Sequence, residues 1–136
     1  MKNVLITGGT GFIGKALTRA VVGRLAPGEG RVISLGSGDV DLTNRDSTFA
    51  WFERIRDGFP CDHIFHLAAL YKAGGWPVEH PATQFFANLS MNVNLLWAWI
   101  RFFPRAKLTS VLSYCMYPPH DRPHPAQRAL PDLQPD

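Results

Sequence analysis

The sequence predicts a doubly wound α/β fold, built on a parallel β-sheet within a single domain of 136 residues. Short runs of β-branched and aliphatic residues alternate with longer segments that show the apolar period of an amphipathic helix. Strands that alternate with helices form βαβ units, in which the strands are parallel and the crossovers right-handed. A glycine-rich turn between the first strand and the first helix also fits this class of fold.

The first half of the chain supplies two predicted strands and two helices. Residues 3–7, NVLIT, form a continuous apolar run that ends at glycines, and residues 12–25, FIGKALTRAVVGRL, repeat apolar residues at helical spacing. Residues 31–35, RVISL, predict a second strand before a polar loop. Residues 46–56 predict a helix whose first turn is acidic, as the helix dipole prefers.

The second half adds a third strand at 63–69, HIFHLAA, a long helix at 81–103 and a fourth strand at 107–114, KLTSVLSY. We expect a truncated sheet of four parallel strands in the order 3-2-1-4, with helices on both faces. Residues 118–136 contain six prolines and no apolar period, which predicts an irregular tail. The expected division is therefore a domain over 1–117 and a proline-rich tail over 118–136 that is either a frayed terminus or a lid.

Composition argues against several classes of protein. Fourteen Lys and Arg against eleven Asp and Glu leave a net charge of +3, and the basic residues are scattered, so we expect no nucleic-acid partner. Two cysteines are too few for a disulfide framework. The N-terminal apolar run is too short for a signal peptide, and LLWAWI is far shorter than the roughly twenty residues that span a bilayer. We expect a cytoplasmic protein without a membrane span.

Five histidines raise the question of a metal site. His63 and His66 have odd and even positions on one predicted strand, so their side chains should point to opposite faces of the sheet. His120 and His124 lie in the proline-rich tail with no thiolate nearby. We expect no metal.

The strongest local motif is TGGTGFIG, in which Gly8, Gly11 and Gly14 are spaced three residues apart. The first glycine permits a tight turn, the second lets backbone N–H groups approach a pyrophosphate, and the third lets helix and strand pack closely. The phosphates would lie at the helix N-terminus, where unpaired N–H groups and the helix dipole favour negative charge. The motif therefore predicts a dinucleotide site in a Rossmann-like fold, which also includes Thr10, Phe12 and Ile13.

The sequence leaves the choice between NAD and NADP open, with NADP favoured. NAD-binding proteins of this kind place an acidic residue after the second strand, where it binds the ribose 2′-hydroxyl. Here that strand runs into SLGSG, which has neither an acid nor an arginine. A 2′-phosphate could accept hydrogen bonds from Ser34, Ser37 and the glycine-rich backbone.

Four motifs in order, TGGTGFIG, DVDL, HLAA and SYCMYP, resemble the extended short-chain dehydrogenase/reductase superfamily, also called the NAD-dependent epimerase/dehydratase superfamily. Within it, SGDVDLTN, HLAAL followed by GG, NLSMNVNLL and SYCMYP are most similar to the GDP-L-fucose synthase family of GDP-4-keto-6-deoxymannose epimerase-reductases. The resemblance covers nearly the whole chain, but only the N-terminal part of such an enzyme.

The resemblance implies roles for several residues. Asp41 and Leu42 would border the adenine, Leu67, Ala68 and Ala69 would line the cofactor path, and Asn88 would lie on the nicotinamide side. Ser113 would donate a hydrogen bond to the 4-keto oxygen of a nucleotide-sugar substrate, and Cys115 would exchange a proton in the epimerisation. A lone cysteine is also commonly a small buried hydrophobe, and a serine at a strand end commonly binds backbone, so both structural alternatives stay open.

One departure from the family concerns its Tyr-x-x-x-Lys pair. The three tyrosines of this chain, Tyr71, Tyr114 and Tyr117, are followed at the fourth place by Gly, Pro and Asp. Two hypotheses follow. The chain is either the cofactor-binding portion of a nucleotide-sugar epimerase/reductase, inactive by itself, or a non-catalytic module that binds a dinucleotide or a partner protein.

The helix predicted at 81–103 is apolar around most of its circumference. Such a helix is buried on more than one side. In the superfamily that the chain resembles, this helix contributes to a dimer interface, so we expect a homo-oligomer; the alternative is that the helix covers only the sheet of its own chain.

Overall fold

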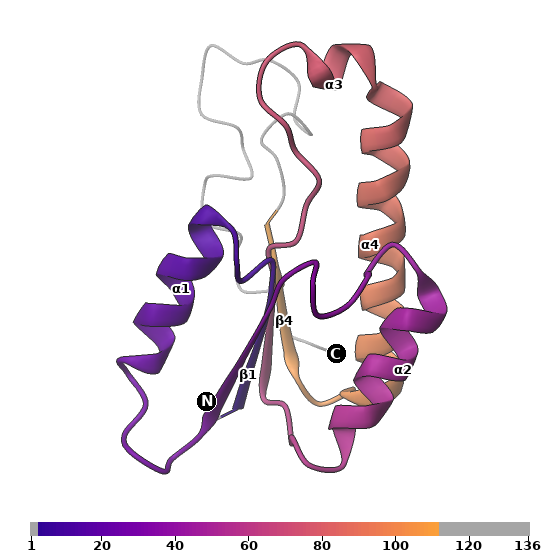
Figure 1. The fold of residues 1–136 in the computed structure, drawn as a ribbon. Helices are drawn as coiled ribbons and strands as arrows, with labels where there is room; N and C mark the ends of the chain where they lie inside the picture. The colour runs from indigo at the N-terminus through magenta and orange to yellow at the C-terminus, as the bar shows by residue number, and fades with distance from the viewer. Residues whose placement is uncertain (1–2, 112–136) are drawn as a thin grey trace, which may run out of the picture.

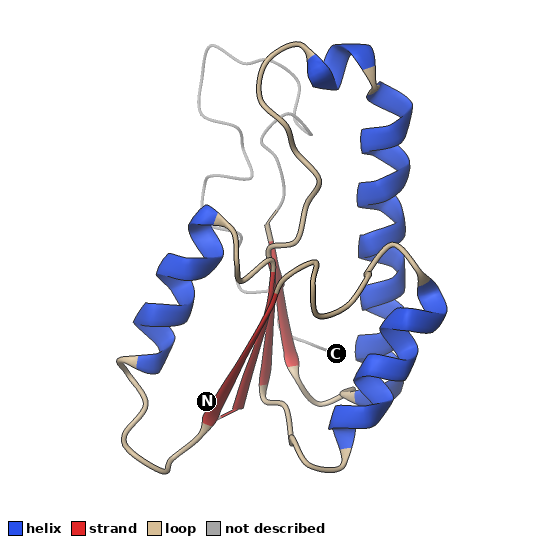
Figure 2. Ribbon diagram, in the orientation of Figure 1, coloured by secondary structure: helices blue, strands red, loops and turns tan. Residues whose placement is uncertain are grey.

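The structure is a computed structural model that describes residues 3–111, and in it a parallel sheet lies between two helical layers (Figures 1 and 2). The elements in chain order are β1 (Asn3–Thr7), α1 (Phe12–Val22), β2 (Arg31–Leu35), α2 (Arg45–Arg56), β3 (His63–His66), α3 (Trp76–Glu79), α4 (Pro81–Phe102) and β4 (Lys107–Ser110). Helix α1 covers one face of the sheet, and α2 and α4 lie side by side on the other. The predicted doubly wound α/β fold is confirmed.

The predicted strand order, 3-2-1-4, is wrong, because the strands of the described sheet follow the order β2-β1-β3-β4. All three pairings are parallel, and Thr7 at the end of β1 lies between Leu35 of β2 and His66 of β3. The third strand therefore pairs with the first rather than with the second.

Crossover handedness explains this order. A right-handed crossover with α1 on one face carries the chain from β1 to β2 in one direction along the sheet. Since α2 lies on the opposite face, a right-handed crossover from β2 reverses the direction and places β3 beyond β1. The exposure of the strands agrees with this order. Val4, Leu5 and Ile6 of the central strand β1 are fully buried, whereas Arg31 of the edge strand β2 is exposed.

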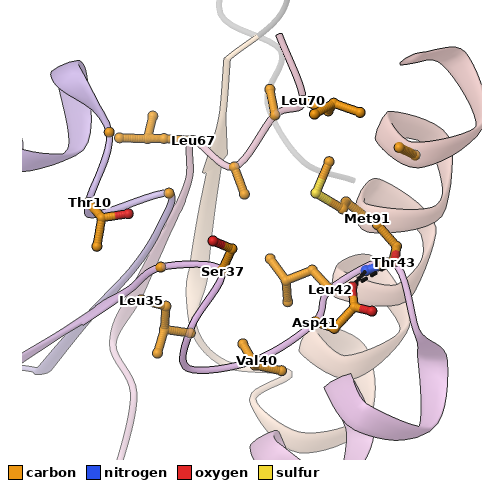
Figure 3. A pocket seen from close by; sticks show the side chains of 16 residues that line it. Thr10, Leu35, Ser37, Val40, Asp41, Leu42, Thr43, Leu67, Leu70 and Met91 are labelled. Carbon is orange, nitrogen blue, oxygen red and sulfur yellow. Dashed lines mark hydrogen bonds between the residues drawn. The ribbon is translucent and has the colours of Figure 1, made fainter. Parts of the chain in front are cut away.

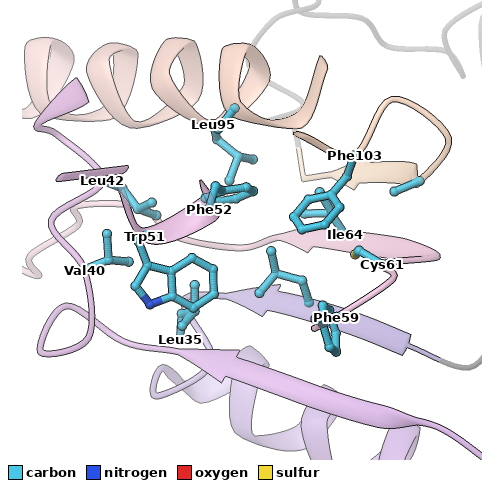
Figure 4. Close-up of a cluster of buried hydrophobic side chains, with 13 residues drawn as sticks. Leu35, Val40, Leu42, Trp51, Phe52, Phe59, Cys61, Ile64, Leu95 and Phe103 are labelled. Carbon is cyan, nitrogen blue, oxygen red and sulfur yellow. The ribbon is translucent and has the colours of Figure 1, made fainter. Parts of the chain in front are cut away.

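Two apolar clusters fill the space between the layers. The larger lies under α2 and α4, where Leu5, Phe52, Ile64 and Leu95 have no exposed surface (Figure 4). The smaller lies under α1 and is built from Val4, Ile6 and Val21. Because alternate residues of a strand face opposite sides, both faces of the sheet bury apolar side chains, which explains the continuous apolar run in β1.

Several boundaries differ from the sequence prediction by a few residues. Helix α1 ends at Val22 rather than 25, before Gly23. Helix α2 begins one residue early, at Arg45, because the Asn44 side chain accepts a hydrogen bond from the Ser47 N–H and caps it. The short helix α3 was not predicted.

The third strand ends at His66 rather than at 69. There the Ala68 N–H donates to the Thr7 hydroxyl, 3.3 Å away, instead of continuing the ladder with a neighbouring strand. The fourth strand pairs with β3 through Ser110, so it loses its partner where β3 ends. Positions 112–114 of the predicted strand, and the predicted tail at 118–136, lie outside the described residues.

The longest helix is α4, with 22 residues. Within residues 3–111, no helix combines the length and the apolar character needed to cross a membrane.

Candidate dinucleotide-binding cleft

A cleft of about 600 Å³ opens at the carboxyl ends of β1, β2 and β3 (Figure 3). Its lining comes from the glycine-rich turn, the loop after β2, the loop after β3 and α4: Gly8, Thr10, Gly11, Leu35, Gly36, Ser37, Val40, Asp41, Leu42, Thr43, Leu67, Ala68, Ala69, Leu70, Ala87 and Met91. The chain leaves β1 toward β2 and returns to the other side as β3. In open α/β sheets, ligands bind at such a reversal point, beyond the carboxyl ends of the strands.

The three motif glycines differ in what surrounds them. Gly8 has a φ of 69°, a conformation that side chains disfavour. A Cβ at Gly14 would lie 2.1 Å from the Gly8 carbonyl oxygen, so this glycine lets α1 approach the turn. A Cβ at Gly11 would meet only that same oxygen, at 3.2 Å, and would otherwise point into open space. Gly8 and Gly14 are thus required by the fold, whereas at Gly11 the fold places only the Gly8 carbonyl oxygen near a side chain.

The N-terminus of α1 is open to an anion. Its N-cap residue, Gly11, has no side chain to satisfy the first N–H groups, and the first turn contains no acidic residue. Helix α2 differs in both respects, because Asn44 caps it and Asp46 lies in its first turn. Four N–H groups at the start of any helix lack an intrahelical acceptor, so the start of α1 fits a phosphate group.

The glycine-rich turn is joined to the end of β2. The Gly9 N–H donates to the Leu35 carbonyl oxygen at 2.7 Å. A Cβ at Gly36 would lie 2.6 Å from the Thr10 side chain, so the two loops are in close contact. Ser34 lies beneath this contact, where its hydroxyl is 3.1 Å from that of Thr18, and it does not line the cleft.

The loop after β2 carries an ionised carboxylate in the cleft wall. The Asp41 Oδ1 atom accepts hydrogen bonds from the Thr43 hydroxyl at 2.6 Å and the Thr43 N–H at 2.9 Å (Figure 3). Both hydrogen bonds lower the pKa of Asp41, and the bond from the Thr43 hydroxyl has the larger effect. Its neighbour Leu42 is buried and extends the wall toward α4.

Two asparagines of α4 hold the two loops that form the cleft walls. The Asn88 side chain accepts from the Leu70 N–H at 2.7 Å and donates to the Leu70 carbonyl oxygen at 3.1 Å. The Asn94 amide donates to the carbonyl oxygens of Leu42 at 2.9 Å and Thr43 at 3.1 Å. Helix α4 therefore fixes the loop after β3 and the loop after β2 at the same time.

The structure brings most of the predicted cofactor-binding residues together around this one cleft. Gly8, Thr10, Gly11, Ser37, Asp41, Leu42, Leu67, Ala68 and Ala69 all line the cleft. Phe12, Ile13, Gly14 and Asn88 do not line it: the Phe12 and Ile13 side chains project into solvent, Gly14 packs on the turn, and Asn88 lies behind Leu70. Ser113 and Cys115 lie outside the described residues.

The sequence did not identify the rest of the lining. No role was predicted for seven lining residues, which reach the cleft through loop and helix packing: Leu35, Gly36, Val40, Thr43, Leu70, Ala87 and Met91. Asn94 was also missed. The available signal was an asparagine pair, Asn92 and Asn94, on the otherwise apolar stretch NVNLLWAWI, since a buried amide requires partners.

The two strand histidines face opposite sides of the sheet, as predicted. His63 stacks on Phe65, with ring centroids 4.1 Å apart, and its Nε2 lies 2.8 Å from the Thr109 hydroxyl. His66 instead contacts Thr7. Among residues 3–111, no three His, Cys, Asp or Glu side chains are grouped as metal ligands.

The comparisons with known proteins agree with this geometry. The model of the NAD dependent epimerase/dehydratase family matches residues 4–135. Over 118 residues the chain is 36% identical to a probable GDP-L-fucose synthase of Drosophila melanogaster, covering 87% of this chain and 35% of that protein. It is 34% identical over 119 residues to the GDP-L-fucose synthase of Dictyostelium discoideum, with 86% and 35% covered.

Solved structures give the same result. A GDP-L-fucose synthetase from Naegleria fowleri superimposes with a TM-score of 0.70 at 30% identity, covering 91% of this chain and 34% of that one. A structure of a GDP-L-fucose synthetase from this organism bound to NADP has a TM-score of 0.70 at 28% identity, with 93% and 35% covered. The chain thus spans about a third of the length of these relatives. With its glycine-rich turn, its cleft at the reversal point and a family match over nearly its whole length, the chain belongs to the NAD dependent epimerase/dehydratase family.

Proposed function

We propose that this chain is the dinucleotide-binding portion of a nucleotide-sugar epimerase/reductase similar to GDP-L-fucose synthase, and that its cleft binds NADP or NAD. The observation that carries the proposal is the uncapped N-terminus of α1, which follows the glycine-rich turn at the edge of a 600 Å³ cleft. Relatives named as GDP-L-fucose synthases support the substrate class, and an NADP-bound structural neighbour supports the cofactor.

The residues present fit such a cofactor. Gly11 leaves room for a pyrophosphate beside the first N–H groups of α1. Ser37, Asp41 and Leu42 would enclose the adenosine half, and the small side chains of Ala68 and Ala69 would leave a path toward the nicotinamide half. A nicotinamide dinucleotide, when bound, supplies hydride transfer.

The substrate side of the proposal depends on residues outside the described range. Ser113 would donate its hydroxyl hydrogen to the substrate's keto oxygen and so stabilise negative charge there. Cys115 would exchange a proton beside the carbonyl. Replacing Ser113 by Ala should leave cofactor affinity almost unchanged, and a large loss of affinity would contradict this role.

The alternative is a non-catalytic module that binds a dinucleotide or a partner protein. Within the 136 residues, no tyrosine is followed by lysine at the fourth place, and these residues span about a third of the relatives' length. The two proposals differ in whether a second chain that carries a Tyr-x-x-x-Lys pair restores turnover.

The cytoplasmic location of the protein also stays a prediction.

We further propose that the chain forms a homo-oligomer through α4. Five exposed apolar residues follow one another at spacings of three and four along this helix: Phe86, Leu89, Val93, Leu96 and Ile100. A 3-4 repeat of apolar residues is typical of a helix that packs against another helix. A second copy of α4 would cover this stripe.

Calorimetric titration of the purified chain with NADPH and NADH tests the proposed function, followed by an assay of reduced-nicotinamide absorbance with GDP-4-keto-6-deoxymannose. Binding without oxidation is the expected result for the cofactor-binding portion of the enzyme. Turnover by this chain alone would contradict the prediction that the chain is inactive by itself. The absence of binding would overturn the site.

A further inference from the structure

Two walls of the cleft, the glycine-rich turn and the loop after β3, are joined through Thr7, the last residue of β1. The Leu67 N–H donates to the Thr7 carbonyl oxygen at 3.2 Å, and the Ala68 N–H donates to the Thr7 hydroxyl at 3.3 Å. The next residue, Gly8, lies so close that a Cβ there would be 2.7 Å from the Ala68 nitrogen. The loop after β3 is therefore held against the glycine-rich turn at this point.

The Thr7 hydroxyl has a second buried contact, to Nδ1 of His66 at 2.7 Å. A hydroxyl has one hydrogen to donate and two lone pairs that accept, and one of these lone pairs receives the Ala68 N–H. Thr7 is fully buried, and within residues 3–111 its hydroxyl hydrogen has no acceptor other than Nδ1. The hydroxyl therefore donates to His66, which places the imidazole hydrogen on Nε2.

The surroundings of His66 agree with a neutral imidazole in this tautomer. Burial lowers the pKa of His66 to about 4, and the side chain that opposes this shift, Asn92 of α4, carries no charge. Nε2 has no hydrogen bond within residues 3–111 in either tautomer, whereas only the Nε2–H form gives the Thr7 hydrogen an acceptor. The other tautomer would leave that hydrogen buried and unpaired, which costs free energy.

Gly8 and Ala68 both line the cleft, so this chain of hydrogen bonds fixes the spacing of two of its walls. Resting on the proposed function, we propose that His66 is a positioning residue for the dinucleotide and that it acts through Thr7. By accepting the hydroxyl hydrogen, its Nδ1 turns a lone pair of the Thr7 oxygen toward the Ala68 N–H. The loop after β3 then keeps the distance from the glycine-rich turn that the cofactor fits, although His66 itself does not line the cleft.

Calorimetric titration with NADH tests this role in the full chain and its variants. His66→Leu removes the acceptor, whereas His66→Asn keeps one in its Oδ1. Thr7→Val removes the hydroxyl and keeps the branched shape. His63→Leu is the matched control, because His63 lies on the same strand but contacts Thr109 and Phe65 instead of the cleft walls.

We expect the Kd for NADH to rise about tenfold in His66→Leu and in Thr7→Val, which corresponds to the loss of one hydrogen bond. The double variant should show the same Kd as either single variant, because His66 acts only through Thr7. His66→Asn should bind nearly as tightly as wild type, and so should His63→Leu. Two independent structural losses would instead add in the double variant.

The imidazole tautomer of wild type gives a readout that needs no variant. Nitrogen NMR shifts of His66 at neutral pH should show a protonated Nε2 and an unprotonated Nδ1. The opposite tautomer would overturn the inference even if His66→Leu failed to fold, and thermal denaturation identifies such a variant.

The titrations separate this inference from the proposed function. Weaker NADH binding in His66→Leu and Thr7→Val, without addition in the double variant and with recovery in His66→Asn, supports the positioning role. If every folded variant binds NADH as wild type does, His66 is only a contact within the fold, while the proposed function stands. If wild type binds no dinucleotide, the proposed function fails and the positioning role fails with it.

Discussion

The Thr7 hydroxyl lies 2.7 Å from Nδ1 of His66, and this buried contact joins the carboxyl ends of β1 and β3. Thr7 is fully buried and His66 is 4% exposed. The same hydroxyl accepts a hydrogen bond from the Ala68 N–H, so it also fixes the first residues of the loop that lines the cleft. The two strands meet at the base of the candidate site through side chains as well as through the ladder.

The first prediction concerns the dependence of stability on pH. Burial lowers the pKa of His66 from 6.5 to about 4, with a smaller opposing effect from the Asn92 side chain. The unfolded chain therefore binds a proton more readily than the folded protein between these values, and stability falls as pH falls. From pH 7 to pH 5, His66 alone should reduce the free energy of unfolding by about 2 kcal/mol.

Urea denaturation of wild type and His66→Asn at several pH values measures this effect. Asparagine cannot titrate, and its Oδ1 can accept a hydrogen bond from the Thr7 hydroxyl in place of the His66 Nδ1. The variant should lose less stability on acidification than wild type. Parallel curves for the two proteins over pH 7 to 5 would show that His66 titrates normally.

The second prediction separates two glycines of the same turn. Gly14→Ala should destabilise the protein by several kcal/mol, because the new methyl group would clash with the backbone of Gly8 and Gly9. Gly11→Val should preserve the fold and abolish dinucleotide binding, because the branched side chain would occupy the approach to the helix N-terminus.

Thermal denaturation and calorimetric titration of the two glycine variants test this contrast. A large fall in the Tm of Gly14→Ala, with a near wild-type Tm and no NADH binding for Gly11→Val, is expected. Wild-type NADH affinity in Gly11→Val would remove this turn from the cofactor site.

The third prediction concerns the asparagine supports of the cleft walls. Asn88→Ala should leave the backbone groups of Leu70 without their partner, which costs about 1 to 3 kcal/mol when the groups stay buried. The loop after β3 should then open more often. Hydrogen exchange at the Leu70 amide should accelerate, while exchange in β1 should change little.

Asn94→Ala provides the matched comparison, since Asn94 supports Leu42 and Thr43 in the other wall. Its effect on exchange should appear in the loop after β2 and not at Leu70. If both variants accelerated exchange equally throughout the described residues, the two walls would not be supported separately.

The fourth prediction tests the exposed stripe of α4. Ile100→Lys places a charge on a residue that is 64% exposed in the single chain, and it should dissociate a homo-oligomer that buries this face. Val22→Lys on α1, 52% exposed and in the opposite layer, is the control. Sedimentation of the three proteins should show a smaller particle only for Ile100→Lys, and a monomeric wild type would refute the proposal.

Local patterns were sufficient for most of the fold. The segments NVLIT and RVISL correspond to β1 and β2 as predicted, and the apolar period placed α1, α2 and α4 within three residues of their ends. These features depend on neighbours in sequence, because hydrophobic periodicity and capping act over one or two turns. The glycine spacing likewise predicted the position of the cleft, since it encodes a backbone shape.

The strand order could not be read in the same way. Whether β3 pairs with β1 or with β2 depends on which face α2 covers, and the apolar residues of α2 could cover either face. Only the packing of Phe52 and Leu95 into one shared cluster decided it. The same limit explains Asn94, whose amide donates to the Leu42 carbonyl oxygen 52 residues away.

The sequence by itself thus determined the class of fold, the identity of most strands and helices, and the glycine-rich turn, because each is a property of a short continuous segment. The tertiary structure decided the order of the strands and the walls of the cleft. It also decided the burial of His66 beside Thr7, because these require segments far apart in the chain to meet, and the free energy of that packing depends on all of them together.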